Sequence, residues 1–214
     1  MESKTKNTLK TILKFVISGG ALYIVFRNID WELTKGILLS ANIGWLLLAT
    51  LLFIGSKVVS AYRLNIYFKN VGLHITEKYN LKLYWVGMFY NLFLPGGIGG
   101  DGFKVYLLHK ESDIKIKPLI QASLLDRISG LASLVFLAGL GYAFMDRSEL
   151  PGWIYWVDLG GLFLIIPVFS FLIAKFFPVF HGSFWITNFH SLAVQLMQVV
   201  SAFFILKALG VTDL

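Results

Sequence analysis

Apolar blocks of about twenty residues recur along the sequence, and they limit the possible folds more than any other feature. A helix of that length crosses the roughly 30 Å hydrocarbon core of a bilayer. The blocks are continuously apolar rather than alternating, which favours helices over the strands of a membrane barrel. Only 14% of the residues are charged, compared with about 25% in a soluble domain. The sequence therefore predicts an all-α fold, a polytopic integral membrane helix bundle that forms a single domain over residues 1–214.

Five of the blocks are long enough to span a membrane, and Lys and Arg gather at their ends. The predicted spans are residues 11–26, 43–66, 118–144, 153–177 and 189–209. Cytoplasmic flanks carry an excess of Lys and Arg, so Lys4, Lys6 and Lys10 place the N-terminus in the cytoplasm. The net charge of +7 is then explained by these flanks and by anionic lipid headgroups. We therefore expect membrane lipids, and no nucleic acid, as partners.

A sixth apolar segment, residues 83–94, is too short to cross. Twelve residues rise only about 18 Å as a helix, and a Pro-Gly-rich run follows at residues 95–102. Lysines flank the segment on both sides, which favours both flanks lying on the same face of the membrane. The sequence therefore predicts a re-entrant segment over about residues 83–102. The alternative, a sixth crossing, would place Lys104 and Lys117 outside, against the charge rule.

The Gly-rich run is the main candidate for a functional site. Residues 97–102 formally match the G-x-G-x-x-G pattern, but a dinucleotide site needs a preceding strand, and no Lys-Ser/Thr pair follows to make a phosphate-binding loop. Pro and Gly at membrane depth instead indicate a broken helix, whose exposed N–H groups can bind an anion such as a lipid phosphate. A plain connecting loop is the alternative. The candidate headgroup-binding residues here are Asn91, Pro95, Gly96, Gly97, Gly99, Gly100 and Asp101.

Charged residues inside the apolar blocks are the second candidate feature. Asp126 and Arg127 lie well inside the fourth span, where each charge costs about 2.5–3.5 kcal/mol and usually faces a cavity or a partner. Arg127 would face Asp101 or a lipid phosphate, whose geometry a guanidinium matches; a snorkelling Arg or a structural ion pair is the alternative. Arg63, at the end of the second span, is also a candidate, although an interfacial anchor that snorkels to the surface is favoured there.

The remaining ionisable residues give no further site. Asp158, near the outer edge of its span, is expected to be solvated. The chain has no Cys, and its four His are scattered without metal-ligand spacing. We therefore expect neither a metal site nor a cofactor, and no catalytic residue is assigned.

Three stretches resemble a known family. NLFLPGGIGGDGFKVYLL at Asn91–Leu108, SLLDRISGL at Ser123–Leu131 and SAYRLNIYF at Ser60–Phe68 are similar to the lysylphosphatidylglycerol synthase transmembrane-region family, also called flippase-like. The matching features are an Asn before Leu-Pro-Gly, a Gly-Gly-Asp, and an acidic-Arg pair opening a long helix.

The resemblance implies a function and a location. It implies a protein of the inner (cytoplasmic) membrane that binds, and translocates, the headgroup of an anionic or polyprenyl-linked lipid. It also implies a domain that continues with a second Pro-Gly-rich motif, so residues 1–214 are expected to be the N-terminal part of a larger flippase-like domain. Without an aminoacyl-transferase domain, a transporter-like protein is favoured over an enzyme. The alternatives are a membrane-embedded transferase acting on a lipid-linked substrate, and a non-catalytic subunit that forms a homo-oligomer or joins a partner membrane subunit.

Overall fold

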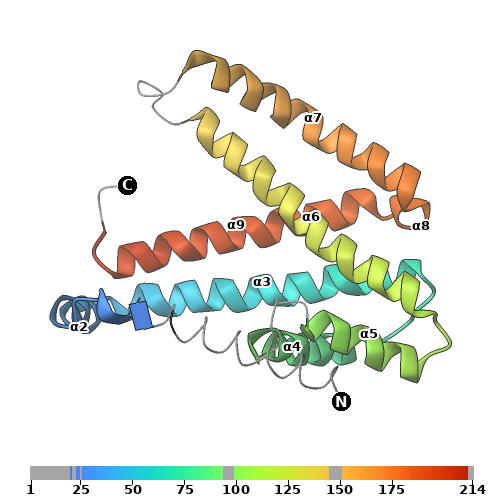
Figure 1. Cartoon of the computed structure of the whole chain (residues 1–214), viewed down its shortest axis with the longest axis horizontal. Coiled ribbons are helices and arrows are strands. Elements are labelled where there is room, and N and C mark those ends of the chain that lie inside the picture. Colours follow the sequence, from blue (N-terminus) through green and yellow to red (C-terminus); the bar gives the residue numbers. More distant parts are fainter. Residues whose placement is uncertain (1–19, 21–22, 25, 94–98, 145–150, 212–214) are drawn as a thin grey trace, which may run out of the picture. The chain divides into compact units, whose positions relative to one another are not determined.

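The computed structural model describes residues 20, 23–24, 26–93, 99–144 and 151–211, and all regular secondary structure in them is helical (Figure 1). Four of the described helices are long and apolar enough to cross a membrane. They are α3 (Ile43–Asn70), α6 (Ile116–Ala143), α7 (Gly152–Phe176) and α9 (Phe184–Ala208). The prediction of a polytopic helical membrane protein is confirmed, and these helices match four of the five predicted spans. The first predicted span, residues 11–26, lies almost entirely outside the described residues.

The described residues fall into two units. The smaller lies within Met1–Leu46 and Ile205–Leu214, and the larger is Leu47–Phe204. The smaller unit contains α2 (Trp31–Ser40), which begins after Asp30 because the Asp30 carboxylate accepts a hydrogen bond from the Leu33 N–H at 3.0 Å. In the same unit the Asn42 N–H donates to the Ala208 carbonyl at 2.9 Å. The larger unit holds every candidate site residue that the structure describes.

A helical hairpin takes the place of the short sixth segment. Its arms are α4 (Glu77–Phe93) and α5 (Gly99–Glu111). The predicted helix break over residues 95–102 does not include Gly99–Gly102, because these residues are helical and open α5; residues 95–98 lie outside the described residues. The Asn91 side chain accepts a hydrogen bond from the Gly100 N–H at 2.8 Å, and Asp101 places an acidic group in the first turn, where the helix dipole favours it.

The arms of the hairpin contact each other near both of their ends. A Cβ built on Gly100 would lie 1.8 Å from the Gly87 carbonyl oxygen, so only glycine allows the backbones of α4 and α5 to approach this closely. At the other end of the arms the Tyr79 hydroxyl donates a hydrogen bond to the Glu111 carboxylate. That bond raises the pKa of Tyr79 to about 12, so the phenol stays protonated at neutral pH.

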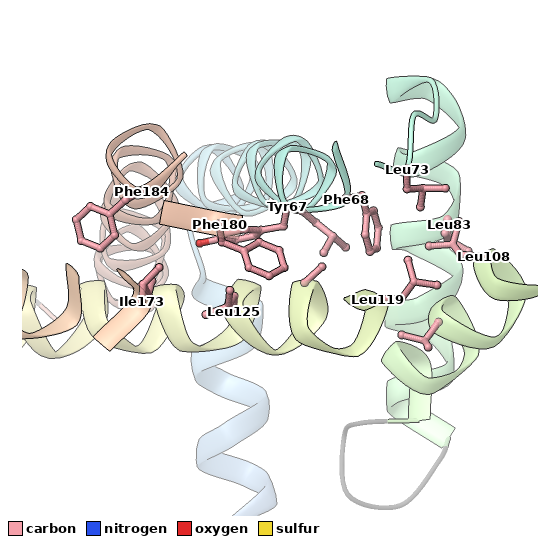
Figure 2. Packing of buried hydrophobic residues seen from close by; sticks show 13 residues of the cluster. Tyr67, Phe68, Leu73, Leu83, Leu108, Leu119, Leu125, Ile173, Phe180 and Phe184 are labelled. Atoms are coloured by element: carbon pink, nitrogen blue, oxygen red, sulfur yellow. The ribbon is translucent and has the colours of Figure 1, made fainter. Parts of the chain in front are cut away.

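The apolar core gathers the ends of the long helices at one place (Figure 2). Leu64 and Phe68 come from the C-terminal part of α3, and Leu119 comes from the first turns of α6. Ile173 near the end of α7 and Phe184 at the start of α9 belong to the same cluster. The C-terminal end of α3 and the N-terminal end of α6 therefore lie at the same end of the larger unit, with the hairpin between them in the chain.

Polar side chains of α9 bind the neighbouring long helices. The Gln195 amide donates to the Gly130 carbonyl of α6 at 2.9 Å, and the Ser201 hydroxyl donates to the Ala49 carbonyl of α3 at 2.8 Å. Such bonds contribute on average about 0.6 kcal/mol each inside a membrane protein. Gln195 therefore attaches α9 to α6, and Ser201 attaches it to α3.

Candidate functional site

Three charged side chains meet where the start of α5 lies against α6. One oxygen of the Asp101 carboxylate accepts from Lys104 Nζ at 2.7 Å, and the other accepts from Arg127 Nε at 2.5 Å. Lys104 is one turn after Asp101 on α5, which brings the two side chains together, and its ammonium also lies 4.9 Å from the centre of the Tyr84 ring. One carboxylate therefore faces two cations, which leaves an excess of positive charge in the cluster.

The members of this cluster differ in their exposure. The Lys104 side chain is 6% exposed and that of Asp101 14%, whereas the Arg127 side chain is 46% exposed. The guanidinium of Arg127 is therefore the part of the cluster that an approaching anion would meet first. The predicted proximity of Arg127 and Asp101 is confirmed by their hydrogen bond.

A groove opens beside the cluster between α5 and α6. It has a volume of about 470 Å³ and is lined by Asp101, Gly102, Val105, Tyr106, Ile116, Ile120, Ser123, Leu124 and Arg127. Most of these side chains are apolar, and the two charged ones lie close together. The groove therefore combines a charged end with hydrocarbon walls, as binding sites for amphiphiles do.

Arg63 is placed differently from the prediction. It is 4% exposed, so it does not snorkel to the surface. Its Nε donates to the Asp126 carboxylate at 2.7 Å and its Nη2 to the Asp126 carbonyl at 2.9 Å, while Nη1 donates to the Ser191 hydroxyl at 2.7 Å. The expectation of an interfacial anchor fails because Arg63 faces α6 and α9, where a carboxylate offsets its buried charge.

The candidate residues therefore fall into two separate groups. Asn91 near the end of α4 and Gly99, Gly100 and Asp101 at the start of α5 lie close together, and Arg127 of α6 joins them through Asp101. Arg63 and Asp126 form a buried ion pair between α3 and α6, which fits the structural alternative considered for a charge in this span. Pro95, Gly96 and Gly97 lie outside the described residues.

A match to a family profile shows that the sequence belongs to a known family of membrane domains. The profile of the lysylphosphatidylglycerol synthase TM region matches residues 11–182, about four fifths of the chain. The chain belongs to this family. The resemblance stated from the sequence motifs is thereby confirmed, and the match includes the hairpin, the Asp101 cluster and the Arg63–Asp126 pair. No curated protein and no solved structure matches the chain.

Sequence reasoning missed three features of this family member. Lys104 was read only as a basic flank, yet it is buried against Asp101; its spacing of three residues from Asp101 was the available signal. Ser123 lines the groove; its position one helical turn before Arg127 was the available signal. Asp158 was expected to be solvated, but its Oδ2 is buried without a hydrogen-bond partner in the part of the chain that the structure describes. The absence of a side chain at Gly139 lets the Asp158 carboxylate approach α6 closely.

Proposed function

We propose that this protein binds the headgroup of an anionic or polyprenyl-linked lipid and moves it across the cytoplasmic membrane. The observation that carries the proposal is the Asp101–Lys104–Arg127 cluster beside an apolar groove. Its excess positive charge favours an anion, and a guanidinium matches the geometry of a phosphate better than an ammonium does. The family membership is consistent with handling of lipid headgroups.

The hairpin is proposed to be re-entrant and to enter the membrane from the cytoplasmic side. Its arms are short for a crossing: α5 has 13 residues, fewer than a crossing helix needs, and α4 has 17, the lower limit. The end of α3 before it and the start of α6 after it share one apolar cluster, which supports an even number of crossings between them. Lys69, Lys78 and Lys117 lie near that end, and the positive-inside rule places them, with the N-terminus, in the cytoplasm.

Leaflet exchange of a labelled lipid tests the proposal. The full chain would be reconstituted into phosphatidylcholine vesicles that contain fluorescent phosphatidylglycerol, and a membrane-impermeant quencher would report the fraction of probe that reaches the outer leaflet. Arg127→Ala and Asp101→Ala should reduce exchange to the rate of protein-free vesicles, because the first removes the exposed cation and the second releases both cations from their fixed positions.

Matched variants control for the loss of charge itself. Arg27 and Asp113 are exposed and outside the groove, so Arg27→Ala and Asp113→Ala should leave the exchange rate unchanged. If Arg127→Ala and Asp101→Ala retain the wild-type rate in correctly folded protein, the cluster does not take part in lipid translocation.

A further inference from the structure

A second groove opens between α6 and α7, and it contains the carboxylate of Asp158. The groove has a volume of about 430 Å³ and is lined by residues 157–168 of α7 and by Val135, Phe136 and Gly139 near the C-terminal end of α6. Asp158 is the only charged residue among those that line it. The groove therefore carries one negative charge between apolar walls.

The Asp158 carboxylate lacks the partners that the other carboxylates of the long helices and the hairpin have. Its Oδ2 is buried, and no hydrogen-bond donor reaches it in the part of the chain that the structure describes. No ion pair found there includes Asp158, whereas Asp101 and Asp126 each pair with a cation. A buried carboxylate oxygen without a donor is unfavourable. A ligand that brings both a positive charge and an N–H donor would supply what is missing.

The groove runs in the direction of a lipid of the outer leaflet. The proposed topology places the start of α7 on the outer side, where the exposed Trp153 and Trp156 suit the membrane interface. Asp158 follows Trp156 by two residues and lies about 3 Å deeper. Val168 follows Asp158 by ten residues and lies about 15 Å deeper, which is half the thickness of the hydrocarbon core. The charged end of the groove therefore lies at headgroup level, and its apolar walls extend towards the middle of the bilayer.

The buried Oδ2 favours one class of cation. A primary ammonium has three N–H donors, whereas the trimethylammonium of phosphatidylcholine has none. A metal ion would need several ligands, and no group of three acidic or histidine residues suited to a metal exists among the described residues. A free amine would make no use of the apolar walls. A phospholipid whose headgroup ends in a primary ammonium uses both parts of the groove.

We propose that the α6–α7 groove binds an outer-leaflet phospholipid with a primary ammonium headgroup, with the ammonium on Asp158 and one hydrocarbon chain along Leu164 and Val168. This inference goes beyond the proposed function. The site has the opposite charge to the Asp101–Lys104–Arg127 cluster and lies near the opposite side of the membrane. It depends on the proposed topology for its leaflet, and it does not depend on translocation.

Native mass spectrometry of the full chain in detergent tests the site, because it counts the lipids bound to each protein molecule. Phosphatidylethanolamine should bind more tightly than phosphatidylcholine with the same chains, and acetylation of its amine should abolish the difference. Asp158→Asn should weaken phosphatidylethanolamine binding about tenfold, as expected for the loss of one charge-assisted hydrogen bond, and should leave phosphatidylcholine binding unchanged. Asp113→Asn makes the same change at an exposed position outside the groove and should bind both lipids as the wild type does.

Two further arms test the hydrocarbon part of the site and its leaflet. Leu164 is 59% exposed and lines the groove, so Leu164→Trp should fold normally, fill the groove and weaken phosphatidylethanolamine binding. Leu131→Trp, at a position 60% exposed and outside the groove, is its matched control. Ethanolamine phosphate, which has no hydrocarbon chain, should not displace the lipid. Because the chain has no Cys, Gly152→Cys provides a unique thiol at the start of α7, and a membrane-impermeant maleimide should label it from outside the cell.

The outcomes separate this inference from the proposed function. Equal affinity for phosphatidylethanolamine and phosphatidylcholine would overturn the role of the ammonium, and unchanged binding in both Asp158→Asn and Leu164→Trp would overturn the groove as the site. Protein dimers that Leu164→Trp abolishes, with no bound lipid, would show that a second copy occupies the groove instead. Labelling of Gly152→Cys only from the cytoplasmic side would overturn the outer leaflet. Binding that depends on Asp158 and Leu164, combined with no leaflet exchange, would support the site and refute translocation.

Discussion

Replacing Asp126 with Leu should destabilise the protein strongly, because it leaves the Arg63 guanidinium buried without its counter-charge. Arg63 is 4% exposed and makes three hydrogen bonds, one of them to the Asp126 carboxylate at 2.7 Å. The variant retains the bonds to the Asp126-position carbonyl and to Ser191 and loses only the one to the carboxylate. The perturbation therefore isolates the charge that offsets Arg63.

The expected magnitude follows from the burial of the pair. Breaking a buried ion pair by removing one partner costs about 3–5 kcal/mol. In a chain of this length about 1 kcal/mol lowers the melting temperature by roughly 2–4 °C, so Asp126→Leu should lower it by about 6–20 °C. Asp126→Asn keeps a neutral acceptor and should lie at the lower end of that range. The double variant Arg63→Met with Asp126→Leu removes both charges and should recover most of the loss.

Thermal unfolding of the full chain in detergent, followed by tryptophan fluorescence, measures these differences. Asp113→Asn makes the same change as Asp126→Asn, but at an exposed position, and should leave the melting temperature unchanged. A shift below about 2 °C for Asp126→Leu would refute the reasoning. The reasoning would also be refuted if the double variant lost as much stability as Arg63→Met and Asp126→Leu lose in sum, because that result would mean the two charges do not interact.

The remaining predictions concern two glycine–neighbour contacts. Gly100→Ala places a Cβ 1.8 Å from the Gly87 carbonyl oxygen, so it should force α4 and α5 apart and make the hairpin sensitive to limited proteolysis. Gly102→Ala is the control: a Cβ there meets nothing within 4 Å, so this variant should stay resistant. Equal cleavage of the two variants would contradict the close approach of α4 and α5. Asp158→Leu removes a buried carboxylate oxygen without a partner among the described residues and should raise the melting temperature by a few degrees, on the order of 1 kcal/mol. A fall in melting temperature would indicate that Asp158 stabilises the contact between α6 and α7.

The long helices could be predicted because uninterrupted hydrophobicity alone defines a span. The last span was predicted to begin at residue 189, yet α9 begins at Phe184 and includes the polar residues Thr187 and Asn188. Thr187 is tolerated there because its hydroxyl donates to the Phe184 carbonyl within the helix. Helix ends are therefore less predictable than spans, because local hydrogen bonds decide them.

The Asp101–Arg127 pair could be predicted from the sequence, whereas the Arg63–Asp126 pair could not. A charge deep in an apolar block requires a nearby partner, and the Pro-Gly-rich run of the sequence offered Asp101 to Arg127. Arg63 lay near the end of its block, where the general rule for anchors applies. The signal that could have corrected this is the spacing of Ser56, Ser60 and Arg63, which marks a polar face on α3. That spacing indicates a buried face but does not say which helix covers it.

The adjacency of Asp126 and Arg127 has a consequence for the movements open to this protein. Consecutive helical residues point about 100° apart, and here one is fastened to α3 and the other to α5. A roll of α6 about its own axis would break both attachments at once. The partly exposed Asp101–Arg127 pair is worth at most about 1 kcal/mol, far less than the cost of breaking the buried pair. Of the two attachments of α6, the one to α3 is therefore the stronger and the ion pair with the hairpin the weaker.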